Sequence, residues 1–76
     1  MEVDASHAFF EVEVPEEWIG KTVGELDIRK RYNINILAVK SGGEFSIAIS
    51  PDTYFAENNK LLVLGEYRAL QKCFRI

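Results

Sequence analysis

Several residue types that commonly reveal function are scarce in this sequence. It has one cysteine, Cys73, and one histidine, His7, so it has no internal disulfide and no zinc site built from Cys and His. Cys73 is expected to pack in the core, with a reactive thiol as the alternative, and a lone cysteine favours a reducing compartment. No apolar run approaches the roughly 18 residues of a transmembrane helix, so direct membrane insertion is not expected.

Sequence motifs that carry catalysis are also missing. The chain has no G-x-G-x-x-G, P-loop or G-x-S-x-G motif. His7 lies near the N-terminus, and the acidic pairs Glu11/Glu13 and Glu16/Glu17 are expected to be solvated faces. We therefore predict that the protein is not an enzyme, with no catalytic residues, no metal ligands and no cofactor.

The length and charge limit the remaining possibilities. A chain of 76 residues forms one domain. A domain of this size buries only about 60% of its unfolded surface, so pairing with a second copy is an attractive source of stability. The net charge of −3 argues against a DNA or RNA partner, although a small anion needs only one or two well-placed donors.

Apolar patterning predicts a small α+β fold of order β-α-β-β-β-α, a sandwich of two helices against one largely antiparallel sheet. The strands are expected at about 8–14, 34–40, 45–49 and 60–65, and the helices at about 23–32 and from Glu66 onward. The side chains expected to face the core from the first and third strands are Phe10, Val12, Val14, Phe45, Ile47 and Ile49. Trp18 is expected to cover the end of the core, and Tyr54 and Phe55 to anchor the irregular segment 51–59.

The stretch 22–40 organises the chain. Thr22 and Glu25 fit a capping box at the start of the first helix, and Asn33 is a plausible left-handed terminator. Apolar residues fall on two sides of this predicted helix, which indicates two neighbours and favours a two-fold dimer. Asn35 interrupts an otherwise apolar strand and therefore needs a partner in protein, water or ligand.

Four parts of the chain carry a resemblance to a known family: residues 20–29, residues 32–40, Pro51 and residues 58–65. Together they resemble the RCK C-terminal (TrkA-C) domain. Within that family the likeness is to the cytosolic gating subunit of Ktr-type bacterial potassium transporters, and it runs from about Phe9 to Phe74. The resemblance implies that residues 8–76 are a regulatory ligand-binding domain. Residues 1–7 would then be a linker or an N-terminus added for expression.

The resemblance also implies a ligand, cyclic di-AMP, bound between two copies and controlling potassium transport. Carried over position by position, the family's polar contacts fall on Asp27, Arg29 and Asn35, and its apolar contacts on Val23, Ile36 and Pro51. Arg29 can donate to a phosphate, and Asn35 suits a phosphate oxygen or a purine edge. Asp27 can accept from an adenine amine or orient Arg29, and the apolar residues offer surfaces for a base.

The implied assembly is larger than this chain. The family's usual partners are an N-terminal RCK domain and a membrane transporter subunit, which would hold the protein in the cytoplasm at the inner face of the membrane. The N-terminal Rossmann domain of the family is not in this sequence. The chain is then an isolated regulatory lobe or a piece of a longer protein.

Other interpretations remain open at this point. Arg29 could pair with Glu25, Asp27 could pair with Arg31, and Asn35 could bond to backbone at a sheet edge. The domain could also serve a cation/proton antiporter, act as a structural dimerisation domain without a ligand, or regulate an enzyme through an ACT-like fold.

Overall fold

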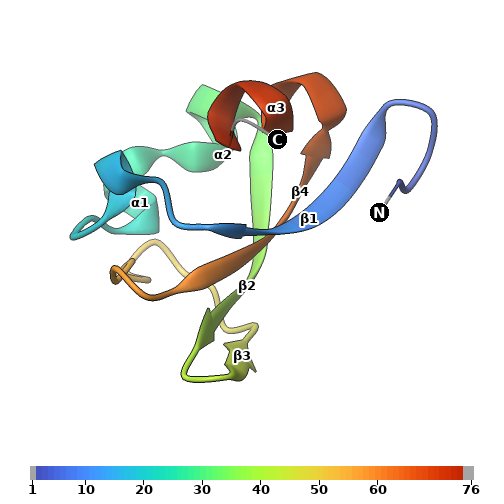
Figure 1. Ribbon diagram of the computed structural model, residues 1–76. Helices are drawn as coiled ribbons and strands as arrows, with labels where there is room; N and C mark the ends of the chain where they lie inside the picture. Colours follow the sequence, from blue (N-terminus) through green and yellow to red (C-terminus); the bar gives the residue numbers. More distant parts are fainter. Residues whose placement is uncertain (1, 75–76) are drawn as a thin grey trace.

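Strand β4 (Lys60–Glu66) is the centre of the sheet in the computed structural model, which describes residues 2–74 (Figure 1). It pairs antiparallel with β1 (His7–Glu13) on one side and with β2 (Ile34–Ser41) on the other. The short β3 (Glu44–Ser46) pairs with the end of β2, giving the order β1-β4-β2-β3. The predicted α+β fold is confirmed.

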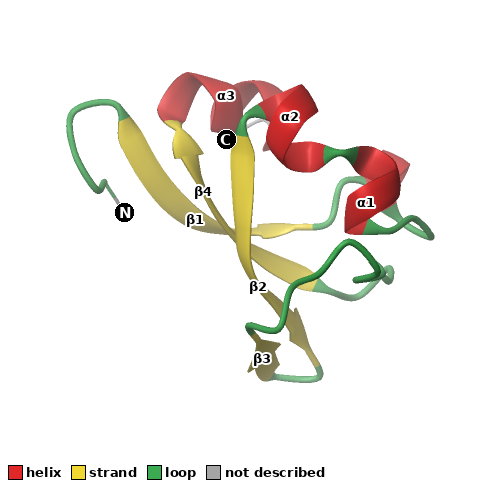
Figure 2. Ribbon diagram, turned by 180° about the vertical axis from the view of Figure 1, so that it is seen from behind, coloured by secondary structure: helices red, strands yellow, loops and turns green. Residues whose placement is uncertain are grey.

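The helices pack on one face of this sheet (Figure 2). They are the 3-10 turn η1 (Glu16–Trp18), α1 (Val23–Leu26), α2 (Ile28–Tyr32) and α3 (Tyr67–Phe74). The core joins this layer to the inward side chains of the strands, among them Val12, Leu61 and Val63. Among residues 2–74, no helix has the length and apolar character needed to span a bilayer.

The prediction of one helix over 23–32 is wrong, because Asp27 adopts a left-handed conformation (φ 50°, ψ 47°) and divides it into α1 and α2. Residues two apart on a continuous helix point about 200° apart, so Leu26 and Ile28 could not both face the core. With the break, they are 5% and 2% exposed. Asp27 tolerates the left-handed region better than most residues. The predicted terminator Asn33 is also left-handed, with φ 56°.

Trp18 covers one end of the core, as predicted. Its ring lies 5.5 Å from that of Tyr32, 5.7 Å from Phe55 and 5.4 Å from Phe74, measured between centroids. These contacts join η1, α2, α3 and the loop before β4. The aromatic cluster therefore fixes where the helical layer sits on the sheet.

The predicted strand 45–49 is mostly wrong. Only Glu44–Ser46 pair with β2, Phe45 and Ile47 are 49% and 83% exposed, and only Ile49 packs against the core. The chain leaves the sheet after Ser46 and runs toward α1, where Gly24 N–H donates to the Pro51 carbonyl at 2.8 Å. Along this segment Phe55 is fully buried, whereas Tyr54, expected as a second anchor, is 58% exposed.

The N-terminal segment folds back on the domain. Glu2 forms an isolated bridge with Ala8, and the Ser6 carbonyl accepts a hydrogen bond of 2.8 Å from the Tyr67 amide at the start of α3. The predicted division into residues 1–7 and 8–76 stays a prediction. Met1 and residues 75–76, at the two ends of these ranges, lie outside the described residues.

Candidate functional site

Four of the six predicted ligand residues meet at one cavity of about 220 Å³ beside α2 and the outer edge of β2. They are Val23 from α1, Arg29 from α2, and Asn35 and Ile36 from β2. These four residues are thus up to 13 positions apart in the sequence. The remaining lining comes from three apolar side chains, Ile28, Ile34 and Ile49.

The sheet leaves this part of β2 accessible. Strand β3 pairs only with positions 39–41 of β2, so in the described chain no strand covers the outer edge of Ile34–Ile36. Helix α1 is fixed nearby by its capping box. The Glu25 amide donates to Thr22 Oγ1 at 3.1 Å, and the Thr22 amide donates to Glu25 Oε1 at 3.0 Å. This predicted motif is confirmed, and it holds Val23 at the cavity wall.

The other two predicted residues do not line the cavity. Pro51 packs against α1, where a Cβ atom placed on Gly24 would come within 2.9 Å of the Pro51 carbonyl oxygen. Pro51 therefore borders the same helix that contributes Val23. Asp27 is exposed at the break between α1 and α2, two residues from Arg29.

The two polar side chains of the cavity, Arg29 and Asn35, have no partners within the described residues. The ion pairs found between residues 2 and 74 are His7–Asp4 and Lys40–Glu11, so the alternative pairs Arg29–Glu25 and Asp27–Arg31 do not form. Glu25 instead bonds to Thr22, because the helix break removes the regular i, i+4 spacing to Arg29. Asn35 makes no side-chain hydrogen bond in this part of the chain and is half-buried. A guanidinium and an amide are thus free beside an apolar wall, an arrangement that suits an organic anion.

Sequence reasoning missed the apolar lining residues Ile28, Ile34 and Ile49. A single helix over 23–32 would turn Ile28 away from Leu26, and only the break at Asp27 brings both to the core side. Ile49 was assigned to a strand interior. Ile49 lies two residues before Pro51, a predicted ligand residue, and this nearness together with its apolar side chain is a signal in the sequence for a place at the site.

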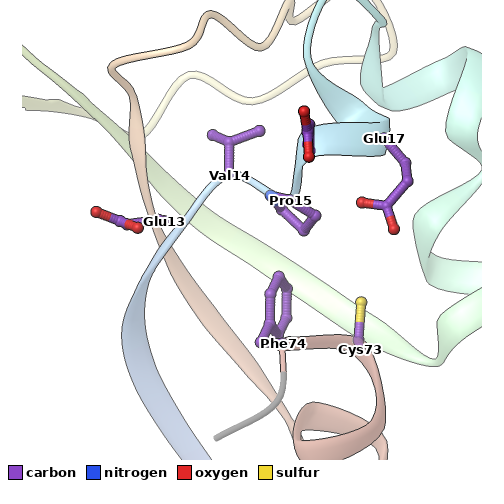
Figure 3. A pocket seen from close by; sticks show the side chains of 7 residues that line it. Glu13, Val14, Pro15, Glu17, Cys73 and Phe74 are labelled. Carbon is purple, nitrogen blue, oxygen red and sulfur yellow. The ribbon is translucent and has the colours of Figure 1, made fainter.

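A larger cavity of about 560 Å³ lies between the end of β1, η1 and the end of α3 (Figure 3). Its walls carry Glu13, Glu16 and Glu17, which would repel an anion. Burial and, secondarily, the charge of Glu17 raise the pKa of the Cys73 thiol to about 11. A thiol that stays protonated at neutral pH is a poor nucleophile, which favours a packing role for Cys73.

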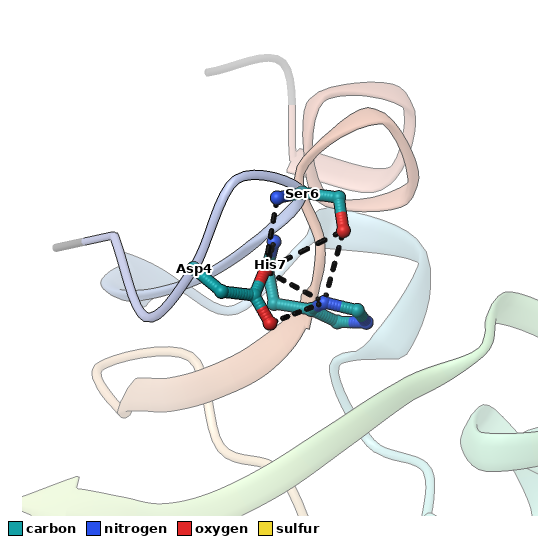
Figure 4. A network of polar contacts seen from close by, with 3 residues as sticks. All are labelled: Asp4, Ser6 and His7. Carbon is teal, nitrogen blue, oxygen red and sulfur yellow. Dashed lines mark hydrogen bonds and ion pairs between the residues drawn. The ribbon is translucent and has the colours of Figure 1, made fainter.

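His7 takes part in a local turn rather than a catalytic relay (Figure 4). Its Nδ1 lies 3.0 Å from Asp4 Oδ1 and 3.1 Å from Ser6 Oγ. In a Ser-His-Asp relay the hydroxyl and the carboxylate contact opposite ring nitrogens, whereas here both contact the same one. The Asp4 carboxylate also accepts from the Ser6 and His7 amides, so the group closes the turn before β1.

Comparison with known proteins gives consistent matches. The TrkA-C domain family model matches residues 8–76. The chain is 35% identical over 65 residues to the K(+)/H(+) antiporter subunit KhtT and 31% identical over 65 residues to the Ktr system potassium uptake protein C, both of Bacillus subtilis (strain 168). These matches cover 84% and 86% of the chain but only 39% and 29% of the relatives, so it spans well under half their length.

Among solved structures, the chain matches the RCK C domain of the potassium transport protein KtrA in complex with cyclic diadenosine monophosphate (c-di-AMP). The TM-score is 0.79 and the identity 33%, covering 87% of this chain and 78% of that one. A channel structure, GsuK bound to NAD, matches with a TM-score of 0.77 and 26% identity, covering 92% of this chain and 13% of that one.

Proposed function

Because this chain belongs to the TrkA-C domain family, we propose that it is the regulatory domain of a bacterial potassium transporter gating subunit and binds cyclic di-AMP between two copies of itself. One observation carries this proposal. The unpaired Arg29 and Asn35 share a cavity with Val23 and Ile36, all four of which were selected from the family resemblance. The KtrA domain, which has the same fold, is in complex with that ligand in its solved structure.

The side chains fit the chemistry of a cyclic dinucleotide. Arg29 offers a planar fork of donors for a phosphate. Asn35 can donate to a phosphate oxygen or pair with a purine edge. Asp27, the residue directly before α2, accepts a hydrogen bond from an adenine amine or orients Arg29. Val23, Ile36 and Pro51 provide the apolar surface on which a base lies.

The size of the cavity supports a shared site. Its volume is about 220 Å³, below the roughly 300 Å³ at which pockets begin to enclose a whole small ligand. One chain thus holds half of a two-fold symmetric ligand, and a second copy supplies the other half. Each Arg29 would then neutralise one of the two phosphates.

A calorimetric titration with a panel of nucleotides tests the identity of the ligand. We expect cyclic di-AMP to release heat with saturation at one ligand per two chains, while AMP and ATP bind at least about tenfold more weakly. Weak and equal binding of all three would contradict the proposal. A complete lack of heat would favour the alternative of a structural dimerisation domain.

The similarity to KhtT supports a second candidate, a regulatory lobe of a cation/proton antiporter. In either case we propose a cytoplasmic location at the inner face of the membrane, reached through an N-terminal RCK domain and a transporter subunit. The two candidates differ in transport chemistry. The test uses vesicles that hold the complete transporter. An antiporter would show ligand-dependent movement of protons in the direction opposite to potassium. A Ktr-type system would show ligand-dependent potassium uptake with no opposite movement of protons.

A further inference from the structure

Three cationic side chains surround a cleft of about 440 Å³ between α2 and α3. Arg31 comes from the last turn of α2, and Arg68 and Lys72 stand one turn apart on α3. Figures 1 and 2 show these two helices side by side at the same end of the sheet. This cleft is separate from the Arg29 cavity, since the two share no lining residue.

The charge of this cleft is not compensated within the described residues. No carboxylate between positions 2 and 74 lines it, and none of its three cations takes part in the ion pairs of that region. The whole chain is acidic, with a net charge of −3, so gathering three of its nine Lys and Arg residues in one cleft is uneven. An anion bound in the cleft would be attracted by all three cations.

The floor of the cleft is apolar and partly aromatic. It is formed by Tyr32, Ala69 and Cys73, all half-buried. The Arg31 guanidinium lies over the Tyr32 ring, 5.4 Å from its centroid. A bare inorganic ion would use the cations but leave this floor exposed to water. A ligand with an anionic group and a flat apolar body would use both parts.

The geometry points to a second ligand site here, which takes one organic phosphate per chain. Arg68 and Lys72 contact the phosphate, the exposed Arg31 side chain turns from the Tyr32 ring to join them, and the apolar body takes its place over Tyr32 and Ala69. The site is complete within one chain, because all its residues come from α2, α3 and the residues at their ends. It does not require the dimer or the cyclic dinucleotide.

A simpler explanation covers part of this cluster. Arg31 and Lys72 lie in last turns, where cations offset the partial negative charge of the helix end. That explanation does not account for Arg68 in the first turn of α3, where the same effect disfavours a cation. It also predicts no gain in affinity from an aromatic body.

Amide NMR titrations with three probes test this inference. The probes are phenyl phosphate, inorganic phosphate, and benzyl alcohol, which has the ring without the charge. We expect phenyl phosphate to shift the amides of residues 31–33 and 68–73, with an affinity at least about fivefold above that of inorganic phosphate. Benzyl alcohol should bind more weakly than either. Equal affinities of the two phosphates, or shifts spread over the surface, would overturn the inference.

Matched double variants separate a site from general charge. Arg68→Gln with Lys72→Gln should weaken phenyl phosphate at least about tenfold. Lys21→Gln with Lys30→Gln removes the same charge from exposed positions outside the cleft and should change the affinity less than about twofold. Equal losses in both would contradict the site. Arg29→Ala should leave phenyl phosphate binding unchanged, so failure here and failure of the cyclic di-AMP proposal are distinguishable.

Discussion

Arg29 and Asn35 are the two residues on which the ligand proposal depends most. Both are free of protein partners among the described residues, and both line the cavity beside β2. Asn35 is half-buried and its amide has no protein partner, so the amide can bond to water or to a ligand. The resemblance selected these residues, and the structure brings them together.

Arg29→Ala should abolish binding of cyclic di-AMP and leave the fold intact. Loss of a charge-assisted bond to phosphate removes roughly 1.5–3 kcal/mol of binding free energy per copy, and a two-fold site loses it twice. The free energy of unfolding should change by less than about 0.5 kcal/mol, because Arg29 is exposed and unpaired. Calorimetry and urea denaturation measure the two quantities.

Lys30→Ala is the control, since it removes the same charge from the adjacent residue, which does not line the cavity. An equal loss of affinity in both variants would mean general electrostatic attraction. An unfolded Arg29→Ala variant would make Arg29 structural.

Asp4 supplies a pH dependence. The backbone hydrogen bonds from Ser6 and His7, and then the His7 side chain, lower the pKa of the Asp4 carboxyl from 3.8 to about 2. Because the pKa is lower in the folded state, the turn is stabilised above pH 3.8 and loses that stabilisation as the pH falls through about 2. The amide shifts of Ser6 and His7 should titrate with that low midpoint. Asp4→Asn should eliminate the transition, and an unchanged titration in that variant would assign it to another group.

The division of residues 23–32 into α1 and α2 shapes the site. It buries Leu26 and Ile28 together and leaves Arg29 beside β2. Local patterns gave the capping box of Thr22 and Glu25 and the stop at Asn33, because each depends only on neighbouring residues. The break at Asp27 depends on where the core lies in three dimensions, which the pattern of one segment does not contain.

Strand β3 illustrates the same limit. Phe45, Ile47 and Ile49 alternate as in a half-buried strand, but β3 ends at Ser46. The chain beyond it instead forms backbone hydrogen bonds to α1 through residues 51–53. One of these bonds ties Val23 N–H to the Thr53 carbonyl at 2.9 Å. Tertiary contacts thus override a local β preference. The same departure brings Ile49 to the cavity, which explains why sequence reasoning missed it.

Gly24→Ala should destabilise the domain, although alanine normally favours a helix by about 1 kcal/mol relative to glycine. The added Cβ would lie 2.9 Å from the Pro51 carbonyl oxygen and 3.1 Å from the Pro51 Cβ, so α1 or the 51–55 segment must shift. We expect a loss of about 1–3 kcal/mol in the free energy of unfolding, measured by urea denaturation. Gln71→Ala, at an exposed position of α3, is the control and should be neutral. A Gly24→Ala variant as stable as the wild type would show that the contact with Pro51 is loose.

One chain buries its own core but leaves surfaces that a second copy could cover. The two apolar sides predicted for residues 23–32 do not require a second chain, because Ile28 is buried within one chain. Two other features support pairing. The outer edge of β2 is uncovered along Ile34–Ile36, and two large apolar side chains are exposed in and just after β3, the strand next to β2: Phe45 and Ile47. An uncovered edge and exposed large apolar side chains both favour association.

Native mass spectrometry in the presence of cyclic di-AMP tests whether two chains share one ligand, because it counts chains and ligands in one species. We predict a complex of two 8.7 kDa chains with a single ligand, lost in Arg29→Ala and kept in Lys30→Ala. A single chain carrying one ligand, or a dimer that takes up none, would contradict a site shared between two chains.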